Sequence, residues 1–128
     1  ALAESSVEQP YADRTRKEHY QWLRERIDPE SDLERRFLDM LYQEGYRLPD
    51  EAQRGITNPR CVVDFFYQPN VCVFCDGSVH DDPDQAARDR SQRNELRRRG
   101  YRVVVIRYDR DLKEQLAQYP DVFGKGAK

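Results

Sequence analysis

The segment from Val62 to Arg107 constrains the fold more than any other part of the sequence. Two apolar runs, Cys61 to Tyr67 and Val71 to Cys75, are separated only by Gln68-Pro69-Asn70, which predicts a β-hairpin. An arginine-rich stretch with helical turn signals follows, and then comes Val103 to Ile106, a run that is apolar on both faces. Because a strand reached through a helical crossover commonly lies parallel to its neighbour, we expect this run to be a buried central strand of a mixed sheet.

Two helices are predicted before this segment. Tyr11 to Ile27 carries an irregular apolar stripe, so we expect this helix to dock on the surface. The second helix is better marked, because Ser31 and Glu34 form an S-x-x-E capping box and apolar residues recur at helical spacing until Gly45 ends it. The stretch from Tyr46 to Pro59 is predicted as loop or short strand.

The remaining elements complete an α/β order. Pro83 to about Arg99 is predicted as a helix that Gly100 ends. Asp111 to Tyr119 is predicted as a short final helix, and Pro120 to Lys128 as a tail. The order helix, hairpin, helix, strand and helix predicts an α/β sandwich around a small mixed sheet.

Size and composition limit the class of protein. The chain has 128 residues, enough for one domain, and we expect residues 1–10 to be a linker before a single domain over residues 11–128, with its core in residues 31–119. Charged residues make up 36% of the chain, but the net charge of −2 argues against indiscriminate coating of nucleic acid. Three cysteines in apolar surroundings, no apolar stretch near about 18 residues and no signal-peptide pattern predict a cytoplasmic protein without a membrane span.

Charges are unevenly distributed along the predicted crossover. An acidic group comes first, formed by Asp76, Asp81, Asp82 and Asp84. A basic group follows directly, formed by Arg88, Arg90, Arg93, Arg97, Arg98, Arg99 and Arg102. This order suits a metal site beside a surface that tracks phosphates. The alternative is a solvated helix face with intrahelical ion pairs.

Asp64 lies in the middle of the apolar run Val-Val-Asp-Phe-Phe. A carboxylate there is unfavourable unless it is paired, hydrogen-bonded or bound to a metal, and by period-two alternation it shares a strand face with Val62 and Phe66. Asp76 and His80 come just after the partner strand, where they can complete a metal site, and His80 can also serve as general base or phosphate donor. The alternative is a buried Asp64 paired with an arginine of the basic helix.

The cysteines offer a second kind of metal site. Cys61, Cys72 and Cys75 with His80 would make a Cys₃His zinc set. Residues 72 and 75 differ by an odd number, so they point to opposite faces of a continuous strand, and the two residues between them favour a strand over a turn. We therefore favour the oxygen-ligand site over zinc.

The three motifs V-D-F-x-Y, V-x-V-F-C-D-G-x-x-H and R-D-R-x-x-R-x-x-L-x-x-x-G-Y-R-V occur in this order along the chain. Together they resemble the very-short-patch mismatch-repair (Vsr-like) endonucleases of the PD-(D/E)XK restriction-endonuclease-like superfamily, over residues 31–110. The resemblance implies a restriction-endonuclease-like α/β/α sandwich with an extra N-terminal helix. It also implies a DNA endonuclease that depends on Mg²⁺, for which Mn²⁺ can substitute.

The resemblance also implies roles for individual residues. Asp64 matches the metal-binding aspartate, Phe74 occupies the slot of the usual second carboxylate, and Asp76 occupies the slot of the usual lysine. The mismatch-repair branch also has phenylalanine in that slot, and there the next backbone carbonyl, that of Cys75 here, coordinates the metal. Histidines assist at positions similar to Asp76 and His80, so the implied metal ligands are Asp64, the Cys75 carbonyl and Asp76.

Three further expectations follow from the resemblance. Glu34 resembles a first-helix glutamate that many relatives direct toward the metal, although the capping box competes for its carboxylate and we expect the cap to use it. Gln53 resembles a glutamine of related nucleases without an assigned role. The arginines of the predicted helix would hold the DNA backbone without reading its sequence, namely Arg88, Arg90, Arg93 and Arg97.

The resemblance also predicts a setting for the protein. This fold is commonly fused to helicases and other DNA-processing enzymes, and the chain begins ALAESS without a start methionine. We therefore expect a module of a larger helicase-type protein of DNA repair or defence in a bacterial-type cytoplasm, with DNA and other domains of the same polypeptide as partners. The rival hypothesis is a degenerate nuclease fold that serves as a DNA-binding or inter-domain docking module. A structural zinc domain is the third.

Overall fold

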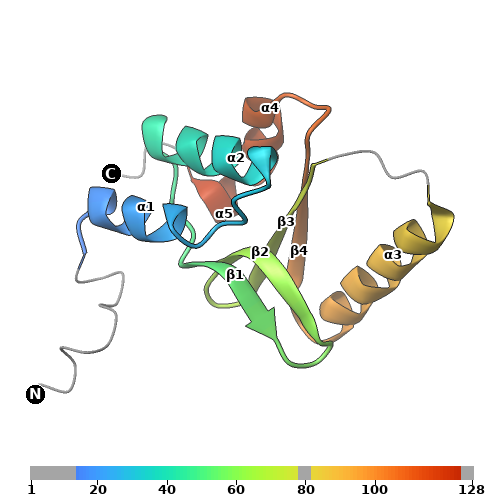
Figure 1. Ribbon diagram of the computed structural model, residues 1–128. Coiled ribbons are helices and arrows are strands. Elements are labelled where there is room, and N and C mark those ends of the chain that lie inside the picture. Colours follow the sequence, from blue (N-terminus) through green and yellow to red (C-terminus); the bar gives the residue numbers. More distant parts are fainter. Residues whose placement is uncertain (1–13, 78–81, 125–128) are drawn as a thin grey trace, which may run out of the picture.

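A computed structural model describes residues 14–77 and 82–124 (Figure 1). The helices are α1 Arg16–Arg24, α2 Asp32–Gln43, α3 Pro83–Arg98, α4 Leu112–Ala117 and α5 Pro120–Phe123. The strands are β1 Glu51–Ile56, β2 Cys61–Tyr67, β3 Val71–Asp76 and β4 Arg102–Arg107. The predicted α/β class is confirmed. None of the described helices combines the length and the apolar character that crossing a membrane requires.

The four strands form one mixed sheet in the order β1-β2-β3-β4. β1 with β2 and β2 with β3 are antiparallel, whereas β3 and β4 are parallel and are joined through α3. The predicted hairpin and the parallel crossover are therefore confirmed. The six residues of β1 confirm the short-strand reading of the stretch before the hairpin.

β4 lies at the edge of the described sheet, so its prediction as a central strand is wrong. β3 is the buried inner strand, with four consecutive buried residues from Val71 to Phe74. β4 is apolar on both faces because helices cover both faces of the sheet: Val104 and Ile106 belong to one core, and Val103 packs against the other. An apolar run of this kind indicates that both faces of the strand are packed against helices. It does not indicate whether the strand has a neighbour on one side or on both sides.

The sheet separates two hydrophobic cores, and Figure 1 shows α3 on one side of it with the other helices on the opposite side. The larger core joins the sheet to α1, α2, α4 and α5, and its fully buried members include Phe37, Phe65 and Phe123. The smaller core lies under α3 around Leu96 and Phe74. The described residues thus form two helical layers around a mixed sheet.

The first helix belongs to the larger core, so the prediction that it docks on the surface is wrong. Leu23 is completely buried and Ile27 nearly so. Its apolar stripe is irregular because His19 is also completely buried and donates from Nε2 to the Pro49 carbonyl at 2.7 Å. Thr15 begins the helix with a capping box to Glu18.

The predicted C-terminal tail is wrong within its described part, because residues 120–123 form α5. Phe123 is completely buried and meets the rings of Phe37 and Tyr67 edge-on, with centroids 5.7 Å and 5.5 Å away. Its carbonyl accepts the Arg47 N–H at 2.7 Å. A helix of a single turn has no periodicity to detect, so the sequence pattern could not reveal it.

The packing of Phe123 predicts a large effect on stability. Phe123→Ala is expected to lower the free energy of unfolding by about 3–5 kcal/mol, because it removes a completely buried ring. Tyr108, which is 40% exposed, supplies the control, and Tyr108→Ala is expected to stay within about 0.5 kcal/mol of wild type. Urea unfolding followed by circular dichroism measures both. Equal losses in the two variants would contradict the assignment of α5 to the core.

Candidate functional site

Asp64 lies where β2 and β3 part. The last residue pair in the register of these two strands is Phe65 with Val73. Beyond it, Asp64 Oδ2 accepts the backbone N–H of Cys75 at 2.7 Å. A side-chain carboxylate therefore joins β2 to β3 at this point, and the N–H of a buried strand keeps a partner.

The alternation of side chains along β2 changes at Asp64. Val63 belongs to the core under α3 and Phe65 to the core under α2, although regular alternation places residues two apart on the same face. Phe66 lies in the α3 core, whereas Asp64 meets side chains of α2 and β1. The prediction that Asp64 shares a face with Phe66 is therefore wrong, because the strand is irregular where the carboxylate sits.

Gln53 of β1 lies opposite Asp64 and has a left-handed backbone with a φ of 52°. This conformation costs a residue with a side chain about 1–2 kcal/mol. The side-chain amide of Gln53 donates from Nε2 to Glu34 Oε1 at 3.0 Å and to Asp64 Oδ1 at 3.4 Å. Gln53 therefore bridges two carboxylates that come from different elements. Sequence reasoning assigned no role to Gln53, and its only signal was the resemblance to a glutamine of related nucleases.

Glu34 points into this cluster and not back to its own helix start. Ser31 Oγ accepts the Glu34 N–H at 3.2 Å, so half of the predicted capping box is present. The Glu34 carboxylate, however, accepts from Gln53 and from the Asp28 N–H, the latter at 3.2 Å. The expectation that the cap uses this carboxylate is wrong, because the Ser31 N–H already donates to the Asp28 carbonyl at 3.0 Å.

Burial raises the pKa of both carboxyl groups, and the hydrogen bond from Glu34 acts against this rise at Asp64. Burial and repulsion from Asp64 raise the pKa of Glu34 to about 7, and only 4% of Glu34 is exposed. Burial also raises the pKa of Asp64, against which the Cys75 N–H acts. Near neutral pH Glu34 therefore changes between its protonated and its ionised form. When both groups are ionised, the pair carries two negative charges.

Asp76, at the end of β3, is held by an arginine of α3. Asp76 Oδ1 and Oδ2 accept from Arg93 at 2.8 Å and 3.2 Å, a two-pronged ion pair. The Arg93 guanidinium lies 4.6 Å from the centre of the Phe74 ring, and 16% of its side chain is exposed. The arginine pairing that we considered for Asp64 is therefore made by Asp76.

The other predicted DNA-contacting arginines lie on the exposed side of α3. Arg88, Arg90 and Arg97 are exposed, with Arg88 hydrogen-bonded to a glutamine and Arg97 to an asparagine of the same helix. Glu95 pairs with Arg98 and Arg99. The alternative of local ion pairs therefore accounts for Arg98 and Arg99 of the basic group.

The predicted histidine and cysteine ligands do not form a described metal site. His80 lies outside the described residues. Cys61 and Cys72 pack with the α3 core, whereas Cys75 packs with the core under α2, as the odd spacing of residues 72 and 75 predicts. Burial raises the pKa of all three thiols, which disfavours the thiolate that zinc binds.

The donor set suits a hard divalent cation better than zinc. Within residues 14–77 and 82–124, no three His, Cys, Asp or Glu side chains are placed to hold one ion. Mg²⁺ commonly takes one or two protein carboxylates and keeps several waters, which Glu34 and Asp64 can satisfy. The Cys75 N–H points at Asp64, and in a strand the carbonyl of the same residue faces the same neighbour, so this carbonyl is a third oxygen on that side.

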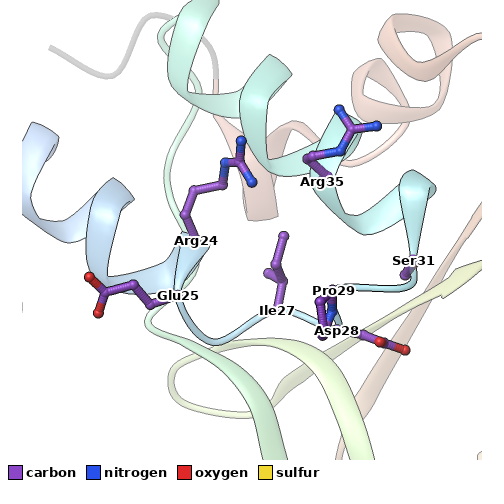
Figure 2. Close-up of a pocket in the computed structure, with 7 residues that line it drawn as sticks. All are labelled: Arg24, Glu25, Ile27, Asp28, Pro29, Ser31 and Arg35. Atoms are coloured by element: carbon purple, nitrogen blue, oxygen red, sulfur yellow. The ribbon is translucent and has the colours of Figure 1, made fainter.

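A separate cavity of about 250 Å³ lies between the end of α1 and the start of α2 (Figure 2). Its lining consists of Arg24, Glu25, Ile27, Asp28, Pro29, Ser31 and Arg35. Both arginines already pair with aspartates, Arg24 with Asp39 at 3.1 Å and Arg35 with Asp32. None of the clustered carboxylates lines this cavity, so the candidate site is the carboxylate cluster itself.

Comparison of the chain with protein-family models, with curated proteins and with solved structures finds no match. The chemistry of the cluster therefore has to be inferred from the arrangement of its own residues.

The raised pKa of Glu34 predicts a pH-dependent stability. A carboxyl group whose pKa is raised on folding stabilises the protein below its ordinary pKa of 4.5, and that contribution is lost as the pH rises through about 7. Glu34→Gln stays neutral, so between pH 4 and pH 8 its free energy of unfolding should gain roughly 3 kcal/mol relative to wild type. Urea titrations at several pH values measure this difference.

The exposed Glu25 supplies the control for this prediction. Glu25→Gln is expected to follow the wild-type stability at each pH. A Glu34→Gln curve that runs parallel to wild type from pH 4 to pH 8 would show that the two carboxylates do not repel each other in the folded chain.

Proposed function

We propose that this chain is a Mg²⁺-dependent DNA endonuclease domain with a restriction-endonuclease-like α/β/α sandwich, related to the very-short-patch branch. The observation that carries the proposal is the convergence of Glu34 and Asp64 on the Gln53 amide, where burial and the charge of Asp64 raise the pKa of Glu34 to about 7 and a cation would be stabilised. The mixed sheet with helices on both faces supports the fold. The exposed arginines of α3 support a nucleic-acid partner.

The described residues divide the work of such a reaction. Glu34 and Asp64 would hold the cation, and the Cys75 N–H and the Gln53 amide would keep the two carboxylates oriented. When bound, Mg²⁺ supplies polarisation of the scissile phosphate and stabilisation of the leaving oxygen. The arginines of α3 would hold the DNA backbone, and His80 stays the predicted residue that positions or deprotonates the attacking water.

A second candidate is a DNA-binding or inter-domain docking module without catalysis. It is favoured by the side of the site next to α3, where the slot of the usual second carboxylate holds Phe74 and its neighbour Asp76 is neutralised by Arg93. Such a module needs the arginines of α3 and has no use for the buried pair of Glu34 and Asp64. Cleavage assays therefore separate the two candidates.

We expect the chain, or the larger protein that contains it, to cleave DNA in the presence of Mg²⁺ or Mn²⁺. Asp64→Asn should reduce the rate by about 100-fold or more, because several kcal/mol of transition-state stabilisation pass through a metal ligand. Asp121→Asn, the same change at an exposed aspartate on α5, is the control and should keep the wild-type rate. Gel assays with supercoiled and linear DNA measure the rates.

Two outcomes would decide against this assignment. Unchanged cleavage by Asp64→Asn would remove Asp64 from the site. A wild-type chain that binds DNA but cleaves none of the substrates would establish the docking module in place of the nuclease.

The DNA-binding role of α3 predicts a salt-dependent effect. Replacing Arg90 and Arg97 together by glutamine should weaken binding to unrelated DNA sequences equally and lower the salt slope of the binding constant by about 2, one unit for each lost phosphate contact. The control is the double change of Arg35 and Arg36 to glutamine on α2. Fluorescence anisotropy over a series of salt concentrations gives the slopes, and equal slopes in the two double variants would contradict a DNA-binding face on α3.

A further inference from the structure

Arg93 donates to both oxygens of Asp76. The two hydrogen bonds, at 2.8 Å and 3.2 Å, use two nitrogens of the guanidinium. Stacking on Phe74 holds the plane of the guanidinium in place. Asp76 follows Cys75, whose N–H binds Asp64, so Arg93 cancels a negative charge at the edge of the carboxylate cluster.

The same guanidinium remains open to solution from the side of α3. About 16% of the Arg93 side chain and 35% of the Asp76 side chain are exposed, so an incoming ligand can reach the pair. Arg90 and Arg97 lie three residues before and four residues after Arg93, which places all three along one side of the helix. A DNA backbone held by Arg90 and Arg97 would thus bring a phosphate to Arg93.

A DNA phosphate would compete with Asp76 for the guanidinium of Arg93. Arginine binds phosphate and carboxylate through the same two-pronged geometry, and a DNA backbone offers several phosphates to one row of arginines. As the guanidinium moves toward a phosphate, its two hydrogen bonds to Asp76 weaken. The carboxylate that is released adds a negative charge beside Glu34 and Asp64.

We propose that Arg93 is a latch that couples DNA binding to divalent-cation binding, an inference that rests on the nuclease function proposed above. In the free chain Arg93 neutralises Asp76, and the cluster binds the cation weakly. When a DNA phosphate takes the guanidinium, the negative charge of Asp76 is no longer neutralised and strengthens the attraction of Glu34 and Asp64 for the cation. DNA and cation then raise each other's affinity by the same factor, as linkage requires.

Binding of Mn²⁺ alone, followed by electron paramagnetic resonance of the free ion, tests the latch without reference to activity. Arg93→Met keeps an apolar contact with Phe74 but frees Asp76, so its Mn²⁺ affinity without DNA should rise about tenfold. Addition of a DNA duplex should tighten Mn²⁺ binding in wild type and leave Arg93→Met unchanged. A gel run on each sample confirms that the duplex is intact during the measurement.

Arg98→Met is the matched control, because it removes the same charge from the last turn of α3 at an arginine that pairs with Glu95. It should keep the coupling between DNA and Mn²⁺, with a smaller change in Mn²⁺ affinity. Asp76→Asn is a second variant that does not depend on Arg93→Met folding well, and it should bind Mn²⁺ weakly with and without DNA. Circular dichroism checks the fold of each variant.

The outcomes separate the latch from the nuclease assignment. Mn²⁺ binding that needs Glu34 and Asp64 but is unaffected by Arg93→Met, or coupling that persists in that variant, overturns the latch alone. Two results overturn both proposals. One is that the wild-type chain does not bind Mn²⁺, and the other is that Glu34→Gln and Asp64→Asn bind Mn²⁺ as tightly as wild type does.

Discussion

The hydrogen bond from the Cys75 N–H to the Asp64 carboxylate is the contact on which the rest of the site depends. It replaces backbone pairing where β2 and β3 part, so a charged side chain becomes part of the sheet itself. The irregular strand then places the carboxylate against α2 and β1, where Gln53 can bridge it to Glu34. An aliphatic residue in place of Asp64 would leave the Cys75 N–H without a hydrogen-bond partner. The pairing of the sheet and the proposed metal site are therefore both served by a carboxylate at this position.

The cluster lowers the stability of the chain in order to hold charge inside it. The charge of the half-buried Asp64 acts on the buried Glu34, and the left-handed backbone of Gln53 adds strain of about 1–2 kcal/mol. Burial and then the charge of Asp64 raise the pKa of Glu34 to about 7, and the hydrogen bond from the Gln53 amide offsets only part of this rise. Locally unfavourable features of this kind gather where a structure serves binding or catalysis, and they are stable only because the surrounding cores determine the fold.

Local patterns in the sequence predicted the elements, and contacts between distant residues decided the rest. The hairpin, α2 and α3 were predictable because each has its own turn or capping residues. The edge position of β4 was not predictable, because its apolar run reflects packing on both faces and not the number of neighbouring strands. In the site, Asp64 could be recognised because a charge interrupts an apolar run, whereas the roles of Gln53 and Glu34 depend on partners that are 11 to 19 residues away and on one unusual backbone angle. Nor does a row of arginines reveal which one pairs with Asp76, 17 residues before it.

The two sides of β3 carry different arrangements of charge, and this difference favours the proposed nuclease over the docking module. On the α3 side, Phe74 and the pair of Asp76 with Arg93 form a neutral, well-packed arrangement that a docking module could keep indefinitely. On the α2 side, Glu34 and Asp64 form the opposite arrangement, since a glutamine in place of Glu34 would relieve the repulsion and keep the hydrogen-bonding shape. A cation at this position would offset the repulsion between Asp64 and an ionised Glu34, which supports the proposed metal site. Under the proposed function, the neutral pair of Asp76 and Arg93 beside it is the part of the site that DNA would contact.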